Sequence, residues 1–165
     1  MTKLEKSLIT LLKQNARLSI TALADMTNAS EKDVEKAIAK LEKDNVILQY
    51  TAVIDDEKVS KTRPKIRSLI EVRVQTEKKA GFNRIAKQIF QHKNVVDHFL
   101  ISGSYDFLII VEGTDLMDIA LFVSNKLAPL ENVKSTTTHF ILKKYKENGV
   151  IYEEHLQKPR LAITP

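Results

Sequence analysis

The chain has 165 residues, 43% of them hydrophobic, and its 26 Lys and Arg exceed its 21 Asp and Glu by a formal net charge of +5. This length allows one domain or two small ones, with enough apolar residues for a real core. The absence of cysteine excludes disulfides, thiolate metal sites and a cysteine nucleophile. Because no stretch is long enough to span a membrane and the N-terminus lacks a signal-peptide core, we expect a cytoplasmic protein with no membrane partner.

The first third of the sequence predicts three short helices. Thr2, Ser19 and Ser30 are capping residues, and each precedes apolar residues at helical spacing. The expected helices run from about residue 3 to 15, from 19 to a turn at 27–29, and from 30 to about 45. Three helices with a tight turn between the second and third have the layout of a helix-turn-helix.

The third helix carries a stripe of positive charge. At 100° per residue its four lysines fall on one face, opposite its apolar residues. These lysines are Lys32, Lys36, Lys40 and Lys43. Like charges four residues apart cost an isolated helix a few tenths of a kcal/mol per pair, a repulsion that a phosphate backbone would relieve. The alternative is an ordinary solvated face, partly neutralised by Glu35 and Asp44.

The segment 46–54, VILQYTAVI, is rich in β-forming residues and predicts either a wing or the start of a connecting strand. Residues 55–65 are charged and contain Pro64, so we expect a linker there. The predicted organisation is a DNA-binding domain over 1–54, a linker over 55–65, a second domain over 66–147 and a tail over 148–165.

The second domain predicts alternating strands and helices. We expect strands at 68–75, 99–101, 107–111 and 134–144, and helices at 80–92 and from Thr114 to Pro129. In the latter helix we expect Leu116 and Ala120, among others, to face inward. The order βαββαβ predicts an α+β fold, a ferredoxin-like antiparallel sheet with two helices on one face. Asn148-Gly149 indicates a turn in the tail, with a short returning strand after it.

The strand expected at 107–111 is apolar at every position, so both of its faces require burial. Helices can cover the face that carries Phe107 and Ile109. The face that carries Leu108 and Ile110 then needs another partner, most simply the same face of a second copy. The turn before this strand, 103–106, offers backbone N–H groups and the carboxylate of Asp106, which suit a zwitterionic amino acid. The simpler reading, which we prefer on physical grounds alone, is that it only closes a hairpin.

The sequence contains no recognisable catalytic constellation. Its four histidines form no pair at metal-binding spacing, and it has no glycine-rich phosphate loop and no G-x-S-x-G turn. We therefore expect neither an enzyme nor a cofactor.

Several segments resemble the Lrp/AsnC family of transcription regulators. LEKSLITLLKQNARLSITALADMT is similar to the opening of that family, and AIAKLEKDNVILQYTAVID to the end of its recognition helix and the connecting strand. LISGSYDF matches the S-G-x-x-D turn of the family, and residues 122–150 resemble the C-terminal signature of one subgroup. The resemblance covers about residues 3–147.

The resemblance implies a winged-helix-like DNA-binding domain and a ferredoxin-like RAM domain that oligomerises and senses a small effector, usually an amino acid. The implied partners are double-stranded DNA, the effector, and the chain itself as a homodimer that builds tetramers or octamers. Together with the lysine stripe, the resemblance assigns DNA contacts to Arg17, Ser30, Lys32, Lys36, Lys40 and Lys43. It assigns effector contacts to Gly103, Ser104, Tyr105, Asp106, Thr136 and Thr138.

Two positions depart from the family pattern. Ala37 stands where members usually have Arg, which removes a potential phosphate or base contact, and Asn45 stands where many have Gly, a mild change at a helix C-terminus. Residues 1–54 hold eight basic against seven acidic side chains, a net charge of only +1.

Three hypotheses follow. The first is a sequence-specific DNA-binding regulator that senses an amino acid. The second is an enzyme or enzyme subunit that uses the ferredoxin-like half as a sensor. The third is an oligomeric sensing module with weak or lost DNA binding, which Ala37 keeps open. The lysine stripe and the missing catalytic groups favour the first.

Overall fold

The computed structural model describes residues 1–59, 65–75 and 79–152, without the side chains of residues 57, 79 and 80. The chain divides into two compact units, Met1–Ile54 and the part that begins at Asp55. Each unit has its own cluster of buried apolar residues. The predicted two-domain organisation therefore matches two separate hydrophobic cores.

The first unit consists of three helices, as predicted. These are α1 (Lys3–Gln14), α2 (Ile20–Thr27) and α3 (Glu31–Lys43), with N-caps Thr2, Ser19 and Ser30. Thr2 and Glu5 form the expected reciprocal capping box. At Ser30 only half of the expected box forms, because the Asp33 carboxylate accepts from the Ser30 hydroxyl instead of the Ser30 backbone. The helices bury a core of Leu8, Leu23, Ala24 and Val34.

The turn between α2 and α3 depends on Asn28. This residue has a left-handed backbone with φ 52°, and its N–H donates to the carbonyls that end α2. Ala29 N–H also donates to the Ala24 carbonyl, at 3.1 Å. Asparagine tolerates this conformation better than most residues, which allows a short turn without glycine. Asn45 has φ 54° just after α3, so it fills the position where many family members have Gly.

The predicted strand over 46–54 is wrong, because these residues form no strand in the structure. Val46 and Ile47 instead donate their N–H groups to the Leu41 carbonyl and close the end of α3. A strand needs a partner strand for its hydrogen bonds, and no other described strand of the chain pairs with this segment. The predicted linker also contains one helical turn, α4 (Asp56–Val59), while Pro64 lies outside the described residues.

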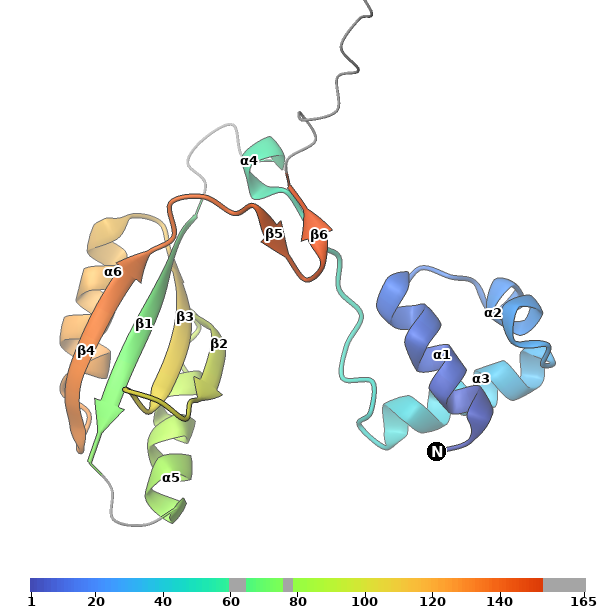
Figure 1. Cartoon of the computed structure of the whole chain (residues 1–165), viewed down its shortest axis with the longest axis horizontal. Helices are drawn as coiled ribbons and strands as arrows, with labels where there is room; N and C mark the ends of the chain where they lie inside the picture. The colour runs from blue at the N-terminus through green and yellow to red at the C-terminus, as the bar shows by residue number, and fades with distance from the viewer. Residues whose placement is uncertain (60–64, 76–78, 153–165) are drawn as a thin grey trace, which may run out of the picture. The chain divides into compact units, whose positions relative to one another are not determined.

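The second unit is the predicted four-stranded antiparallel sheet. Its strands are β1 (Ile66–Val74), β2 (Val95–Leu100), β3 (Phe107–Gly113) and β4 (Val133–Phe140), in the spatial order β2-β3-β1-β4. Figure 1 shows α5 (Lys79–Phe90) and α6 (Leu116–Phe122) on one face of this sheet. The order β1-α5-β2-β3-α6-β4 confirms the ferredoxin-like prediction. The last strand ends at Phe140, four residues earlier than predicted.

The core of this unit lies between the sheet and the two helices. Its fully buried residues alternate along β1 and β3, as expected for strands that present one face to helices. They include Ile70, Val72, Phe107, Ile109 and Val111 from the strands and Ile85, Ile89 and Ile119 from the helices.

Two details of α6 differ from the prediction. Asp115, not Thr114, is the N-cap, and its carboxylate accepts from Asp118 N–H. Leu116 is 55% exposed instead of facing inward, and Ala120 is also exposed. The helix then widens into a π-helical turn, η1 (Val123–Leu127), which still buries Leu127. A π-helical turn holds more residues than an α-helical turn, so a pattern counted at 3.6 residues per turn does not predict it.

The predicted turn at Asn148-Gly149 is confirmed. It joins two short strands, β5 (Lys146–Glu147) and β6 (Val150–Ile151), and both turn residues have positive φ, 49° and 83°. This hairpin crosses the boundary that we placed between the domain and the tail at residue 148.

Candidate functional site: a DNA-binding helix and a ligand-binding sheet

Helix α3 presents the lysine stripe to solvent. All four of its lysines are exposed, while Val34 and Leu41 on the opposite face are buried. Lys32 and Lys36 make no ion pair with any described residue. The helix therefore offers positive charge along its exposed face, as expected of a recognition helix that contacts phosphates.

Lys40 differs from the other lysines because it is held by α1. Its Nζ lies 2.7 Å from Oε1 of Glu5, a carboxylate whose side chain is only 5% exposed. The hydrogen bond from Lys40 lowers the pKa of Glu5, and the bond from Thr2 N–H acts in the same direction. Lys40 thus helps to join α1 to α3, a role that its place in the stripe did not reveal.

The other assigned DNA contacts have different surroundings. Arg17 is exposed and its backbone N–H donates to the Asn15 side chain. The Ser30 hydroxyl is already used inside the cap of α3. Ala37, at the position where family members usually have Arg, is partly buried and packs against the core of the first unit.

The turn before β3 is tied to its own sheet. Ile101 N–H donates to the Asp106 carbonyl at 2.8 Å, and Asp106 N–H donates to the Val72 carbonyl at 3.0 Å. The Asp106 carboxylate accepts from Val74 N–H at 2.8 Å, across to the end of β1. The backbone of Asp106 closes the hairpin, as in the reading that we preferred on physical grounds, and its carboxylate also ties the turn to β1. Its other carboxylate oxygen makes no hydrogen bond with a described residue.

Gly103 is not required by the fold of the single chain. Its φ is not in the left-handed region, and a Cβ added there would contact only Ile101 Cγ2, at an ordinary 3.7 Å. Gly113 provides the contrast, since a Cβ there would lie 2.9 Å from Ile119 Cγ1 and would disturb the packing of α6. At position 113 the fold explains the glycine, and at position 103 it does not.

Thr136 and Thr138 lie on one face of β4, as predicted, but on the face that carries the helices. They pair with Val72 and Ile70, two buried residues, and paired residues of neighbouring strands share a face. β1 stands between β4 and the turn, so Thr136 is roughly 10 Å from the start of β3. A ligand at the turn would have to span β1 to reach the threonines.

The face of the sheet without helices carries partly exposed apolar residues. Leu69 pairs with Ile110, and Leu108 pairs with Phe99, which is 49% exposed. Leu69, Leu108 and Ile110 have intermediate exposure, whereas their neighbours in the strands are buried against the helices. The prediction that Leu108 and Ile110 face away from the helices is confirmed.

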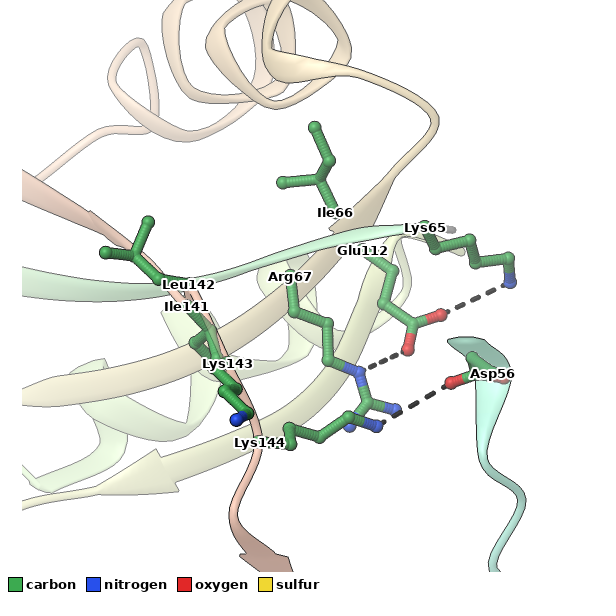
Figure 2. Close-up of a pocket in the computed structure, with 9 residues that line it drawn as sticks. All are labelled: Asp56, Lys65, Ile66, Arg67, Glu112, Ile141, Leu142, Lys143 and Lys144. Carbon is green, nitrogen blue, oxygen red and sulfur yellow. Dashed lines mark hydrogen bonds and ion pairs between the residues drawn. The ribbon is translucent and has the colours of Figure 1, made fainter. Parts of the chain in front are cut away.

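Sequence reasoning missed a pocket at the far end of the sheet. It has a volume of about 210 Å³ and is shown in Figure 2. Arg67 donates from Nε to Glu112, at 2.5 Å, and from Nη1 to Glu147. These partners lie 45 and 80 residues from Arg67 in the sequence, so no local pattern connects them. The alternation within β1, which places Arg67 on the face opposite Ile70, was the only available signal.

Comparison with family models matches both units. The model of the Lrp/AsnC ligand-binding domain matches residues 67–151, and that of a winged helix-turn-helix DNA-binding domain matches residues 1–47. No helix in the described part of the chain is long and apolar enough to cross a membrane.

Individual proteins agree with these matches. The chain is 36% identical to the HTH-type transcriptional regulator YugG of Bacillus subtilis, over all of this chain and 99% of that protein. It is 22% identical to the DNA-binding transcriptional activator DecR of Escherichia coli, over 87% of this chain and 93% of that one. Among solved structures, MtbAldR has the same fold, with a TM-score of 0.76 and 22% identity over 88% of this chain and 97% of the other. So has the NMB0573/L-Met complex from Neisseria meningitidis, with a TM-score of 0.70 and 22% identity over 89% and 93%.

The lysine-bearing helix of the first unit and the ferredoxin-like sheet of the second are thus the two parts of one known architecture. This chain belongs to the Lrp/AsnC family and is a DNA-binding transcription regulator with an Lrp/AsnC ligand-binding domain.

Proposed function

We propose that this chain is a sequence-specific regulator that acts as a homodimer and changes its DNA affinity when a free amino acid binds the turn at 102–106. The role is regulatory and not catalytic. The observation that carries the proposal is Gly103, a glycine that the single chain does not need for its own fold.

Dimerisation is supported by the uncovered face of the sheet. Leu69, Leu108 and Ile110 are apolar and only partly buried in one chain. Covering such side chains contributes roughly 1.5–3 kcal/mol each. A second sheet of the same kind supplies an equally apolar surface, related by a two-fold axis, as most homodimers are. Higher oligomers, tetramer or octamer, would build on this dimer.

Effector binding is supported by the chemistry of the turn. At Gly103 no side chain blocks the approach of a ligand carboxylate to the backbone N–H groups. The free oxygen of the Asp106 carboxylate suits the ammonium group of an amino acid through a charge-assisted hydrogen bond. The Neisseria relative is a complex with L-methionine, which supports an amino acid as the class of effector. Ser104 and Tyr105 complete the turn; Thr136 and Thr138 belong to the site only if the ligand spans β1.

DNA binding at specific sequences is supported by α3. Lys32, Lys36 and Lys43 are exposed on the face that the helix-turn-helix presents, and Lys40 shares that face while bound to Glu5. Phosphate contacts from such lysines fix the orientation of the helix on the duplex, and side chains near its N-terminus then reach base edges.

The test is a thermal-shift screen of the chain and two variants against the twenty amino acids. Asp106→Asn keeps an oxygen acceptor for Val74 N–H but loses the negative charge, whereas Asp106→Ala loses both. We expect at least one amino acid to raise the melting temperature of the wild-type chain, and neither variant to respond. Removal of the charged partner should weaken binding by roughly 2–5 kcal/mol. A full response in Asp106→Asn would refute the assignment.

A further inference from the structure

The pocket beside α4 is separate from the turn that we assign to the effector. Arg67 pairs with Glu112 at this end of the sheet, and Val72 pairs with Phe107 next to the turn. Arg67 and Val72 are five steps apart along β1, roughly 17 Å at 3.3 Å per residue. The two places can therefore hold different molecules.

The guanidinium of Arg67 is fixed before any ligand arrives. Its Nε lies 2.5 Å from Glu112 Oε1, its Nη1 donates to Glu147, and its side chain is only 21% exposed. Nη2 has no hydrogen-bond partner among the described residues. A planar guanidinium that is held on two sides loses little conformational freedom when its remaining donors bind an anion.

The two glutamates are themselves held in the charged form. Burial alone would raise the pKa of Glu147, but hydrogen bonds from Lys144 and Tyr152 outweigh it and the pKa lies below its ordinary value. Burial would likewise raise the pKa of Glu112, and its bonds from Arg67 and Lys65 reverse the shift. The Arg67 guanidinium is thus fixed by two carboxylates that remain ionised at neutral pH.

The lining of the pocket combines basic and acidic side chains with few apolar ones. Glu147 binds Arg67 and Lys144 beside the pocket and offsets one positive charge, while the lining itself has four basic side chains against two acidic ones, which leaves a surplus of one positive charge. These are Lys65, Arg67, Lys143 and Lys144 against Asp56 and Glu112. Of the apolar residues at the pocket, Ile141 is hydrogen-bonded to the Arg67 carbonyl. Ile66 packs against the core on the helix face, and Figure 2 shows the Leu142 side chain directed to the same side as Ile66.

We propose that this pocket binds a small anion, a carboxylate or phosphate group joined to a short apolar moiety, between Arg67 Nη2 and Lys144 Nζ. Ile141 contacts the apolar part of the ligand. The volume of about 210 Å³ exceeds that of a cavity of roughly 150 Å³ that accepts benzene. This site is additional to the effector turn and does not depend on it.

Binding at this pocket has a consequence for the linker. Lys144 Nζ lies 3.6 Å from Asp56 Oδ2, which belongs to α4, the first helix after the DNA-binding unit in the chain. An anion on Lys144 competes with Asp56 for the same ammonium group. Occupation of the pocket therefore weakens the attachment of α4 to the ligand-binding unit.

The experiment follows the backbone amide resonances of the ¹⁵N-labelled full chain during two titrations, one with inorganic phosphate and one with butyrate. Sodium chloride at matched ionic strength is the baseline. We expect saturable shifts at residues 66, 67, 112 and 141–144 and at α4, with the turn at 102–106 unaffected. Saturation by phosphate alone identifies a phosphate ligand, and by butyrate alone a carboxylate. Shifts that scatter over all lysines without saturating would overturn the proposal.

Variants at Leu142 test the charge of the pocket without touching its ion pairs. Leu142 is 95% exposed, so substitutions there leave the fold intact. Leu142→Glu places a negative charge at the pocket and should weaken anion binding about threefold to tenfold, the effect of one charge a few ångströms away in a wet site. Leu142→Gln has the shape of Leu142→Glu without the charge and should bind the anion more tightly than Leu142→Glu does. Equal affinities of these two variants would contradict the proposal.

Arg67→Gln should abolish saturable binding, and Arg73→Gln is its matched control. Arg73 lies on the same strand and the same face but outside the pocket. If Arg67→Gln does not fold, the Leu142 pair still decides the question. Equal losses in both arginine variants would show that only general positive charge attracts the anion.

Discussion

The two units of this chain obtain their order from different kinds of interaction. In the first unit each helix is specified by neighbours in the sequence, with a capping residue, an apolar stripe and an asparagine at the following turn. In the second unit the sheet brings together residues far apart, such as Arg67 with Glu112 and Glu147. The two units also differ in net charge. Residues 1–54 carry eight basic and seven acidic side chains, and the remainder of the chain carries eighteen and fourteen. The DNA-binding unit thus depends on where its lysines lie rather than on its net charge.

The largest expected effect concerns the uncovered face of the sheet. The double variant Leu108→Asp, Ile110→Asp places two carboxylates on a surface that we propose to be buried between copies. The loss should be about 3–6 kcal/mol of dimer stability, on the scale of burying two such side chains. Sedimentation should show monomers or insoluble chains. A soluble dimer of native size would show that this face of the sheet does not form the dimer interface.

The separation of the two cores can be tested next. Leu8→Ala and Ile109→Ala each remove a fully buried side chain, the first from the three-helix core and the second from the sheet. Each should cost about 2–5 kcal/mol. Hydrogen exchange should show that protection is lost only in the unit that carries the change. Loss of protection in both units from either variant would mean that the two cores fold as one.

The lysine stripe allows a test of phosphate contacts. Log affinity for DNA should fall with log salt by about 0.9 for each phosphate neutralised. Lys32→Gln and Lys36→Gln together should flatten that slope by up to about two such steps and weaken binding to all sequences alike. Lys13→Gln, an exposed lysine near the end of α1, is the control. An unchanged slope would show that another surface contacts the DNA.

The smallest expected effect is a pH dependence at His98. This side chain packs against Phe107, with ring centroids 4.8 Å apart, and its Nε2 is buried without a partner in the described structure. Burial lowers its pKa, so the folded chain binds fewer protons than the unfolded chain, whose histidine has a pKa of about 6.5. Stability is therefore complete above that pH and falls as the pH drops through it.

Denaturation at pH 7.5 and 5.5 tests this assignment. The difference in the free energy of unfolding between the two pH values should shrink in His98→Leu and remain in His139→Gln, which changes an exposed histidine. Glu112 and Glu147 have lowered pKa values and titrate below this range. If His98→Leu shows the same pH dependence as the wild type, another group is responsible.

The sequence predicted the helices and the order of the strands because capping, periodicity and alternation are local signals. It failed at 46–54, where β-forming residues pair with no other described strand, and at α6, where Leu116 and Ala120 are exposed while Ile119 and Phe122 are buried. At the candidate sites it predicted the lysines and the turn, whose roles stay predictions. It could not show that Lys40 is bound to Glu5, that Asp106 accepts from Val74, or that β1 separates the threonines from the turn, because these are contacts between distant residues.

Control of DNA binding by an amino acid at the turn can be measured directly as an affinity, by fluorescence anisotropy. A duplex selected by the protein from a random pool is titrated with the full chain, with and without the amino acid that stabilises it. We expect a change in affinity of about fivefold or more in the wild type, the ordinary range of coupling between two sites, and none in Asp106→Ala. Equal affinities with and without every amino acid, or an undiminished response in Asp106→Ala, would contradict this expectation.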